Sequence, residues 1–231
     1  MKIELGNYEL DCDIDPRIQN NASDETIVIE DVGFIFNCVF KQRRAFEYSV
    51  ESIKKVYPNS KIYAVSDGGH DYSYMEDDNV KCSLEEDTVS HLKPINGDNF
   101  RDPRYQIATR NGMKATICML DPDVLVRGKI SHPINGKVLG TRLNVAWMTE
   151  QCLDQFMELN EVLAEVEGSI PVLRWGAAPV VFHTETFLKA LKVYEENFDI
   201  LDKLPEKHYA PGTFDLFICL IFALIGEPEV Y

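Results

Sequence analysis

The sequence is short of basic residues, and this shortage narrows the kinds of partner that the protein can bind. Its 231 residues include 23 Lys and Arg against 38 Asp and Glu, which gives a formal net charge of −15. Nucleic acid is therefore not an expected partner, because phosphate backbones are bound mainly through Lys and Arg. A phosphorylated small molecule would also be repelled unless a metal ion or a local basic cluster lay beside it.

Cysteine motifs for zinc or redox chemistry are also missing. The six cysteines, at positions 12, 38, 82, 118, 152 and 219, form no Cys-x-x-Cys pair and show no metal-finger spacing. Cys38, Cys118 and Cys219 lie inside apolar runs. This placement favours buried free thiols in a reducing compartment over a disulfide framework.

The sequence contains no long hydrophobic run. The longest, residues 216–225, is far shorter than the ~20 residues of a membrane-spanning helix, so we interpret it as a buried core helix. Acidic residues near the N-terminus occupy the region where a signal peptide has its apolar core. The sequence therefore predicts a cytoplasmic protein without a transmembrane segment, whose length and 45% hydrophobic content suit one domain.

From residue 32 onward, strand patterns alternate with helix patterns. Residues 32–40 and 61–65 are apolar runs typical of strands, and residues 45–56 between them carry apolar side chains at helical spacing. A turn with an acid and two glycines, residues 66–69, follows the second strand. Strand, helix and strand in this order predict a βαβ unit with parallel strands.

The functional prediction centres on the stretch from Ile117 to Asp123. Four apolar residues run directly into Asp121 and Asp123, which are separated by Pro122. An apolar run of this length is typical of a buried strand, and open α/β sheets bind ligands at the carboxyl ends of their strands. Two carboxylates at this spacing can offer oxygen to one divalent cation, while Pro122 stiffens the turn. The alternative interpretation is a solvated surface turn.

Four stretches of the sequence, taken in order, resemble one known family. They are Cys38-Val39-Phe40-Lys41 with Arg43, residues 63–69, residues 109–112, and residues 119–123. Their order and spacing are similar to those of the GT-A fold glycosyltransferases of the family 2 type, over residues 32–126. The resemblance implies an α/β fold of the GT-A (Rossmann-like) kind, with a mostly parallel central sheet flanked by helices in a single domain.

The resemblance also implies a division of the chain. Residues 32–231 would form the glycosyltransferase domain, with a nucleotide-binding half at 32–126 and an acceptor half at 127–231. Residues 1–31 would form an N-terminal extension. Their alternation of polar and apolar residues around Gly6-Asn7 predicts a short hairpin.

The activity of the family that the sequence resembles implies an activity and a set of site residues for this protein. The protein would move a hexose from a nucleotide-diphosphate donor, most simply a UDP-sugar, to an acceptor hydroxyl of a carbohydrate or glycan, with Mn²⁺ or Mg²⁺ and inversion. Asp123 would ligate the metal, and Asp121 would share the metal and face the ribose and diphosphate. The main chain at Cys38, Val39 and Phe40 would line the nucleotide pocket. The remaining site residues would be Asp67 at the base, Arg110 at phosphate, Trp175 and Gly176 at the sugar, and Asp215 as general base.

Plainer interpretations remain open for most of these residues. Asp67 can serve as a turn residue, Arg110 as a solvent-facing helix residue, Trp175 as core and Asp215 as a helix-start acid. The histidines His183 and His208 could complete a metal site or be structural. The alternative to an inverting mechanism is a retaining one, which needs no general base. Two rival functions are a nucleotidyltransferase, although residues 40–43 lack the glycine of its loop, and a non-catalytic binding module.

Overall fold

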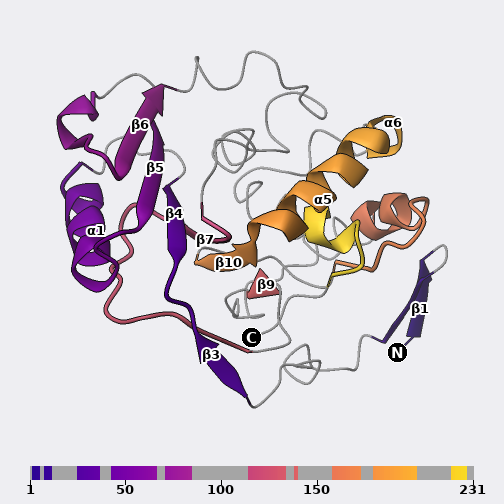
Figure 1. The fold of residues 1–231 in the computed structure, drawn as a ribbon. Coiled ribbons are helices and arrows are strands. Elements are labelled where there is room, and N and C mark those ends of the chain that lie inside the picture. Colours follow the sequence, from indigo (N-terminus) through magenta and orange to yellow (C-terminus); the bar gives the residue numbers. More distant parts are fainter. Residues whose placement is uncertain are drawn as a thin grey trace.

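The structure is built around a six-stranded sheet with the strand order β6-β5-β4-β7-β10-β9 (Figure 1). This computed structural model describes residues 2–5, 8–11, 25–36, 43–66, 71–84, 114–133, 138–139, 158–172, 179–201 and 220–227. The strands of the sheet are β4 (Val32–Phe36), β5 (Lys61–Ser66), β6 (Val80–Leu84), β7 (Thr116–Leu120), β9 (Val138–Leu139) and β10 (Val180–His183). The pairs β6·β5, β5·β4 and β4·β7 are parallel, whereas β10 runs antiparallel to both of its neighbours. The prediction of a mostly parallel α/β sheet is confirmed.

The central strands are buried on both faces, which is why they read as continuous apolar runs. In β7, Ile117 and Met119 belong to one hydrophobic core, while Cys118 and Leu120 belong to the other. This alternation follows from the side-chain period of two along a strand. Cys118 is a buried free thiol, as predicted, and burial raises its pKa to about 12.

Helices cover the two faces of the sheet and complete three layers. Helix α1 (Arg43–Val56) turns Phe46, Val50 and Ile53 into one core, at the spacing of an amphipathic helix. Helix α5 (Thr184–Glu196) packs on the other core together with helical residues 158–163 and 220–223. Figure 1 shows α1 and α5 on opposite sides of the strands. Two short helices are η1 (Ser73–Met75), which contacts β6, and α6 (Phe198–Leu201), which contacts α5.

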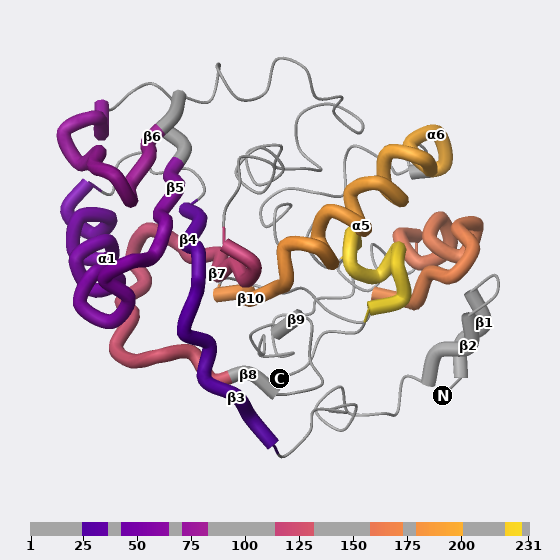
Figure 2. Tube along the Cα trace, in the orientation of Figure 1, coloured from indigo at the N-terminus to yellow at the C-terminus, as the bar shows by residue number. Residues whose placement is uncertain are grey.

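Within the first thirty residues, the described part contains three strands, which belong to two small sheets. Strands β1 (Lys2–Leu5) and β2 (Tyr8–Asp11) pair antiparallel, with Leu5 opposite Tyr8. Strand β3 (Thr26–Val28) pairs antiparallel with β8 (Ser131–Pro133). Figure 2 shows β3 leading directly into β4 along the chain. The N–H of Ile29 then donates to the carbonyl of Ile130 over 2.9 Å. The last residues of the predicted N-terminal extension therefore pair with the segment that follows β7.

The junction between β10 and α5 depends on the contacts of one residue. Thr184 is a favourable N-cap by type, but the N-cap of α5 is His183. The Thr184 hydroxyl instead donates to the carbonyl of Lys114 over 2.6 Å, and its N–H donates to the carbonyl of Ala115 over 2.9 Å. Thr184 therefore extends the pairing of β10 with the chain that enters β7. In the part of the chain that the structure describes, no helix is both long and apolar enough to cross a membrane.

Candidate functional site

The topology of the sheet selects one edge as the place for a ligand. Along the chain, β5 and β6 are added on one side of β4, whereas β7 is added on its other side. The direction of strand addition therefore reverses between β4 and β7. These two parallel strands end together, because Phe36 pairs with Leu120. In open α/β sheets, ligands bind beyond the carboxyl ends of the strands at such a reversal.

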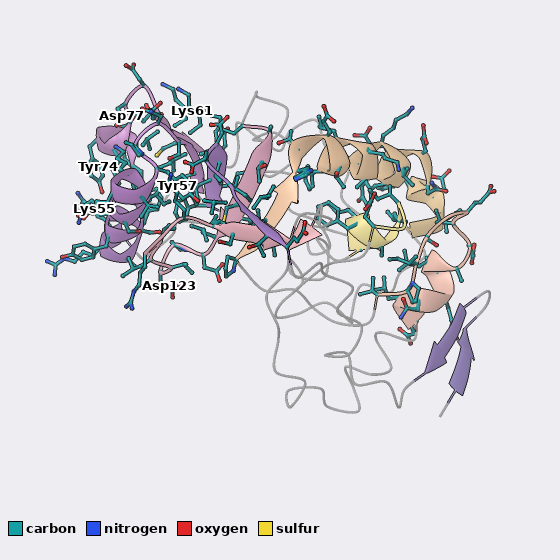
Figure 3. All side chains as sticks on the ribbon, turned by 60° about the horizontal axis from the view of Figure 1, so that its bottom comes forward. Lys55, Tyr57, Lys61, Tyr74, Asp77 and Asp123 are labelled. Carbon is teal, nitrogen blue, oxygen red and sulfur yellow. The ribbon has the colours of Figure 1, made fainter. Side chains whose placement is uncertain are left out.

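The two predicted acids stand at this point on a tight turn. Asp121 follows Leu120, the last residue of β7, and the N–H of Val124 donates to the Asp121 carbonyl over 3.1 Å. Pro122 is buried and occupies the second position of the turn, which its fixed φ suits. Asp121 and Asp123 are both exposed. Figure 3 shows Asp123 on the side of the molecule that α1 occupies, away from α5.

The turn concentrates negative charge in a partly desolvated place. The pKa of the Asp121 carboxyl is raised, first by desolvation and second by the negative charge of Asp123. Asp121 has an accessible surface typical of an exposed residue, yet enough protein surrounds it for desolvation to be the larger cause. A cation bound between the two carboxylates would remove the repulsion that disfavours their joint ionisation.

The donor set of the turn fits a hard divalent ion that is shared with a phosphate ligand. Among the described residues, no three His, Cys, Asp or Glu side chains are grouped so that they could hold a metal. An all-protein cage is therefore not present in this part of the chain. Mg²⁺ and similar ions are commonly held by one or two carboxylates plus substrate phosphates, so Asp121 and Asp123 are sufficient protein ligands for that arrangement.

His183 is not part of this site. It pairs with Thr116 at the start of β7, whereas Asp121 follows the end of the same strand. The length of the strand separates their backbones by roughly 16 Å. The possibility that His183 completes the metal site at the Asp-x-Asp turn is therefore wrong.

The other predicted site residues cannot be located in the same way. They lie outside the described residues, and they are Cys38, Val39, Phe40, Asp67, Arg110, Trp175, Gly176 and Asp215, together with His208. Of the proposed site, the structure therefore describes the Asp121–Asp123 turn and the ends of β4 and β5.

Two residues next to the site were missed by the sequence prediction. Ser49 and Ser52 of α1 hydrogen-bond to the main chain that follows the turn, at Val124 and Val126. The sequence contained one usable signal, because Ser49 lies between Phe46 and Ile53 on the apolar face of the helix. A serine at such a position needs a hydrogen-bond partner from another part of the chain.

The fold and the turn together define a class: an α/β protein in which an acid pair suited to a divalent cation lies at a reversal of strand order. Comparison with protein families finds no family model that matches, and comparison with curated proteins finds no relative.

Comparison with solved structures finds similar folds in sugar-transferring proteins. A mannosyltransferase from Pyrobaculum calidifontis, solved with GDP-Man and Mn²⁺, is 12% identical with a TM-score of 0.39, over 70% of this chain and 48% of that one. The glycosyltransferase GlyE of Streptococcus pneumoniae is 12% identical with a TM-score of 0.43, over 83% and 43%. Glucosyl-3-phosphoglycerate synthase from Mycobacterium tuberculosis, solved with uridine diphosphate, is 12% identical with a TM-score of 0.42, over 87% and 82%.

These similarities concern the same class of protein that the four sequence stretches resemble. The chain spans about half the length of the mannosyltransferase and of GlyE. The TM-scores, 0.39 to 0.43, are too low to carry a conclusion about function. The features of this chain that bear on its function are therefore the sheet and the Asp-x-Asp turn.

Proposed function

We propose that the protein transfers a hexose from a nucleotide-diphosphate donor, a UDP-sugar in the first instance, to an acceptor hydroxyl of a carbohydrate or glycan. The transfer depends on Mn²⁺ or Mg²⁺ and inverts the anomeric configuration. One observation carries the proposal: Asp121 and Asp123 stand on a turn that begins directly at the end of the central parallel strand β7, where the order of strands reverses.

The two acids have different roles at the diphosphate. In this proposal Asp123 ligates the ion, and Asp121 contributes a second oxygen while facing the ribose. The bound ion would offset the negative charge that builds on the leaving diphosphate. Without it, a diphosphate would meet two carboxylates on a protein of net charge −15, so the acids themselves make binding conditional on the cation.

The neighbouring strand ends supply the rest of the donor site. Strand β4 ends at Phe36, shortly before Cys38, Val39 and Phe40 in the sequence, and β5 ends at Ser66, one residue before Asp67. We assign the nucleotide pocket to the first segment and recognition of the base edge to Asp67. Arg110 is assigned to phosphate, and Trp175 with Gly176 to the sugar.

The experiment that tests this function is a calorimetric titration of the protein with UDP, with and without Mn²⁺. We expect binding that requires Mn²⁺ and that is lost in Asp123→Ala, while the variant stays folded because the side chain is exposed. Asp78→Ala removes the same charge from another exposed position and should bind as the parent does. UDP binding that ignores Mn²⁺, or no binding at all, would favour a non-catalytic module. Pyrophosphate release from a nucleoside triphosphate and a sugar phosphate would favour a nucleotidyltransferase.

Asp215 is assigned as the general base that takes the acceptor proton. It precedes an apolar run, so the sequence predicts the first turn of a helix, where an anion is stabilised. Asp215→Asn keeps the shape and removes the basic oxygen, so turnover should fall by ~10²-fold or more with donor affinity little changed. Near-normal turnover, or a product that keeps the anomeric configuration of the donor, would contradict this role and favour a retaining mechanism.

A further inference from the structure

The segment that leaves the Asp-x-Asp turn runs along helix α1. Val124, Val126 and Ile130 are partly buried against the hydrophobic core that α1 covers, whereas Leu125 between them is 51% exposed. This in-and-out alternation is that of an extended chain lying on a surface. Whatever fixes this segment to α1 also fixes the turn that precedes it.

Ser49 of α1 holds the first residue of this segment. It is fully buried, and its hydroxyl donates to the carbonyl of Val124 over 2.5 Å. The N–H of the same residue donates to the carbonyl of Asp121 and closes the turn. Val124 is therefore tied at its carbonyl to α1 and at its N–H to Asp121.

Ser52 holds the next inward residue. Its hydroxyl accepts from the N–H of Val126 over 2.9 Å and donates to the carbonyl of Ser49 over 2.7 Å. Residues three apart lie on one face of a helix, so the two serines present one pair of hydroxyls to one segment of chain. The main chain is thus held at two points close behind the two acids.

Helix packing alone does not explain these hydroxyls. Alanine is a better helix former than serine and would fill an apolar face without desolvating a hydroxyl. The serines are explained by what they bind, which is the main chain next to the turn. Two like charges on an exposed turn repel each other. Hydrogen bonds that hold the main chain beside the turn therefore oppose the separation of the two carboxylates.

We propose that Ser49 and Ser52 are positioning residues: by holding Val124 and Val126 against α1, they keep the carboxylates of Asp121 and Asp123 at the spacing that one divalent cation needs. The part of this inference that concerns the cation rests on the proposed function. The part that concerns the geometry of the turn does not. Partners that orient metal ligands in this way are worth about 10- to 100-fold in metal affinity.

The test measures the turn and the cation separately in the full chain. Amide hydrogen exchange by NMR reports local opening at Val124 and Val126, and titration with Mn²⁺ alone reports the carboxylate pair. Exchange should accelerate roughly five- to tenfold, at Val124 in Ser49→Ala and at Val126 in Ser52→Ala. Mn²⁺ affinity should fall by about 10-fold in both variants.

Two further variants keep the test specific. Ser60 is also buried, and its hydroxyl has no hydrogen-bond partner, so Ser60→Ala should change neither measurement. Ser52→Thr keeps the hydroxyl at a half-buried position, so amide exchange and Mn²⁺ affinity should stay as in the parent protein. If Ser49→Ala does not fold, the comparison of Ser52→Ala with Ser52→Thr still tests the proposal.

The outcomes distinguish this inference from the proposed function. Unchanged exchange at Val124 and Val126 in the alanine variants would overturn the positioning role. Faster exchange with unchanged Mn²⁺ affinity would also overturn it, since the serines would then stabilise the segment only. If the parent protein bound Mn²⁺ neither alone nor together with UDP, the proposed function would fail, while the exchange measurements would still decide whether the serines hold the turn.

Discussion

Two carboxylates near each other in a partly desolvated turn make the site sensitive to pH. A raised pKa means that the folded protein holds the Asp121 proton more tightly than the unfolded chain does. The stability contributed by this group is therefore present below the ordinary pKa of an aspartate, and it is lost as the pH rises through the raised value. Cation binding has the opposite dependence, because only the ionised carboxylate is a ligand.

Replacing one acid should change the titration of the other. In Asp123→Asn the pKa of Asp121 should fall towards its usual value without reaching it, because desolvation, the larger cause of the shift, remains. The carboxyl ¹³C shift of Asp121, followed over a pH titration, measures this. Asp78→Asn is the control and should leave the Asp121 curve unchanged. An equal pKa in parent and Asp123→Asn would mean that the two carboxylates do not interact.

At the scale of elements, one buried asparagine joins a helix to an extended segment. Asn160, in helical residues 158–163, is 1% exposed. Its Nδ2 donates to the carbonyl of Val172 over 2.9 Å, and its Oδ1 accepts from the N–H of Val172 over 2.7 Å. The side chain therefore satisfies both main-chain groups of a buried residue, as a neighbouring strand would. Gly168, with φ of 81°, supplies the left-handed turn between the two.

Loss of the Asn160 side chain should lower the free energy of unfolding. Asn160→Ala leaves the N–H and the carbonyl of Val172 buried without partners, so the free energy of unfolding should fall by about 2 kcal/mol or more. Urea denaturation measures the change. The matched control is Asn197→Ala, since the half-buried Asn197 makes a single side-chain hydrogen bond, to the carbonyl of Val193 over 2.8 Å. That control should cost about 1 kcal/mol or less. Equal losses of unfolding free energy in the two variants would show that the two hydrogen bonds to Val172 stabilise the protein no more than the single bond of Asn197 does.

At the scale of the whole molecule, the net charge of −15 acts on every charged ligand that approaches. Helices cover both faces of the sheet, which leaves the strand ends as the route by which a polar ligand reaches its centre. A cation is attracted to such a protein and a nucleotide is repelled from it, whatever the local contacts are.

Salt should therefore move the two ligands in opposite directions. Raising ionic strength from about 0.01 M to about 0.15 M shortens the Debye length from roughly 30 Å to roughly 8 Å. Mn²⁺ affinity should fall, whereas the affinity for UDP at saturating Mn²⁺ should rise. Both are measured by titration on the same protein, so each ligand is the control for the other. A parallel loss of affinity for both would indicate a general salt effect and not the charge of the protein.

The elements that could be predicted from sequence are those with a strong local pattern. The apolar run of β7 and the helical spacing of Phe46, Val50 and Ile53 in α1 are local signals, and the structure contains both elements. The Asp121–Asp123 turn at the end of β7 was predicted for the same reason. The N-cap of α5 has no such local signal, because the hydroxyl of Thr184 does not cap the helix and donates to the carbonyl of Lys114, 70 residues away in the chain.

The sequence by itself determined where β4, α1, β5 and β7 lie and that two acids follow an apolar strand, because periodicity and turn chemistry act over a few residues. Only the tertiary structure decided that β7 is added beside β4 on the side away from β5, that β10 runs antiparallel to β7, and that His183 stands at the opposite end from Asp121. It also brought Ser49 to Val124. These are contacts between residues far apart in the chain, and they are chosen by which faces bury apolar surface together, which no local pattern records.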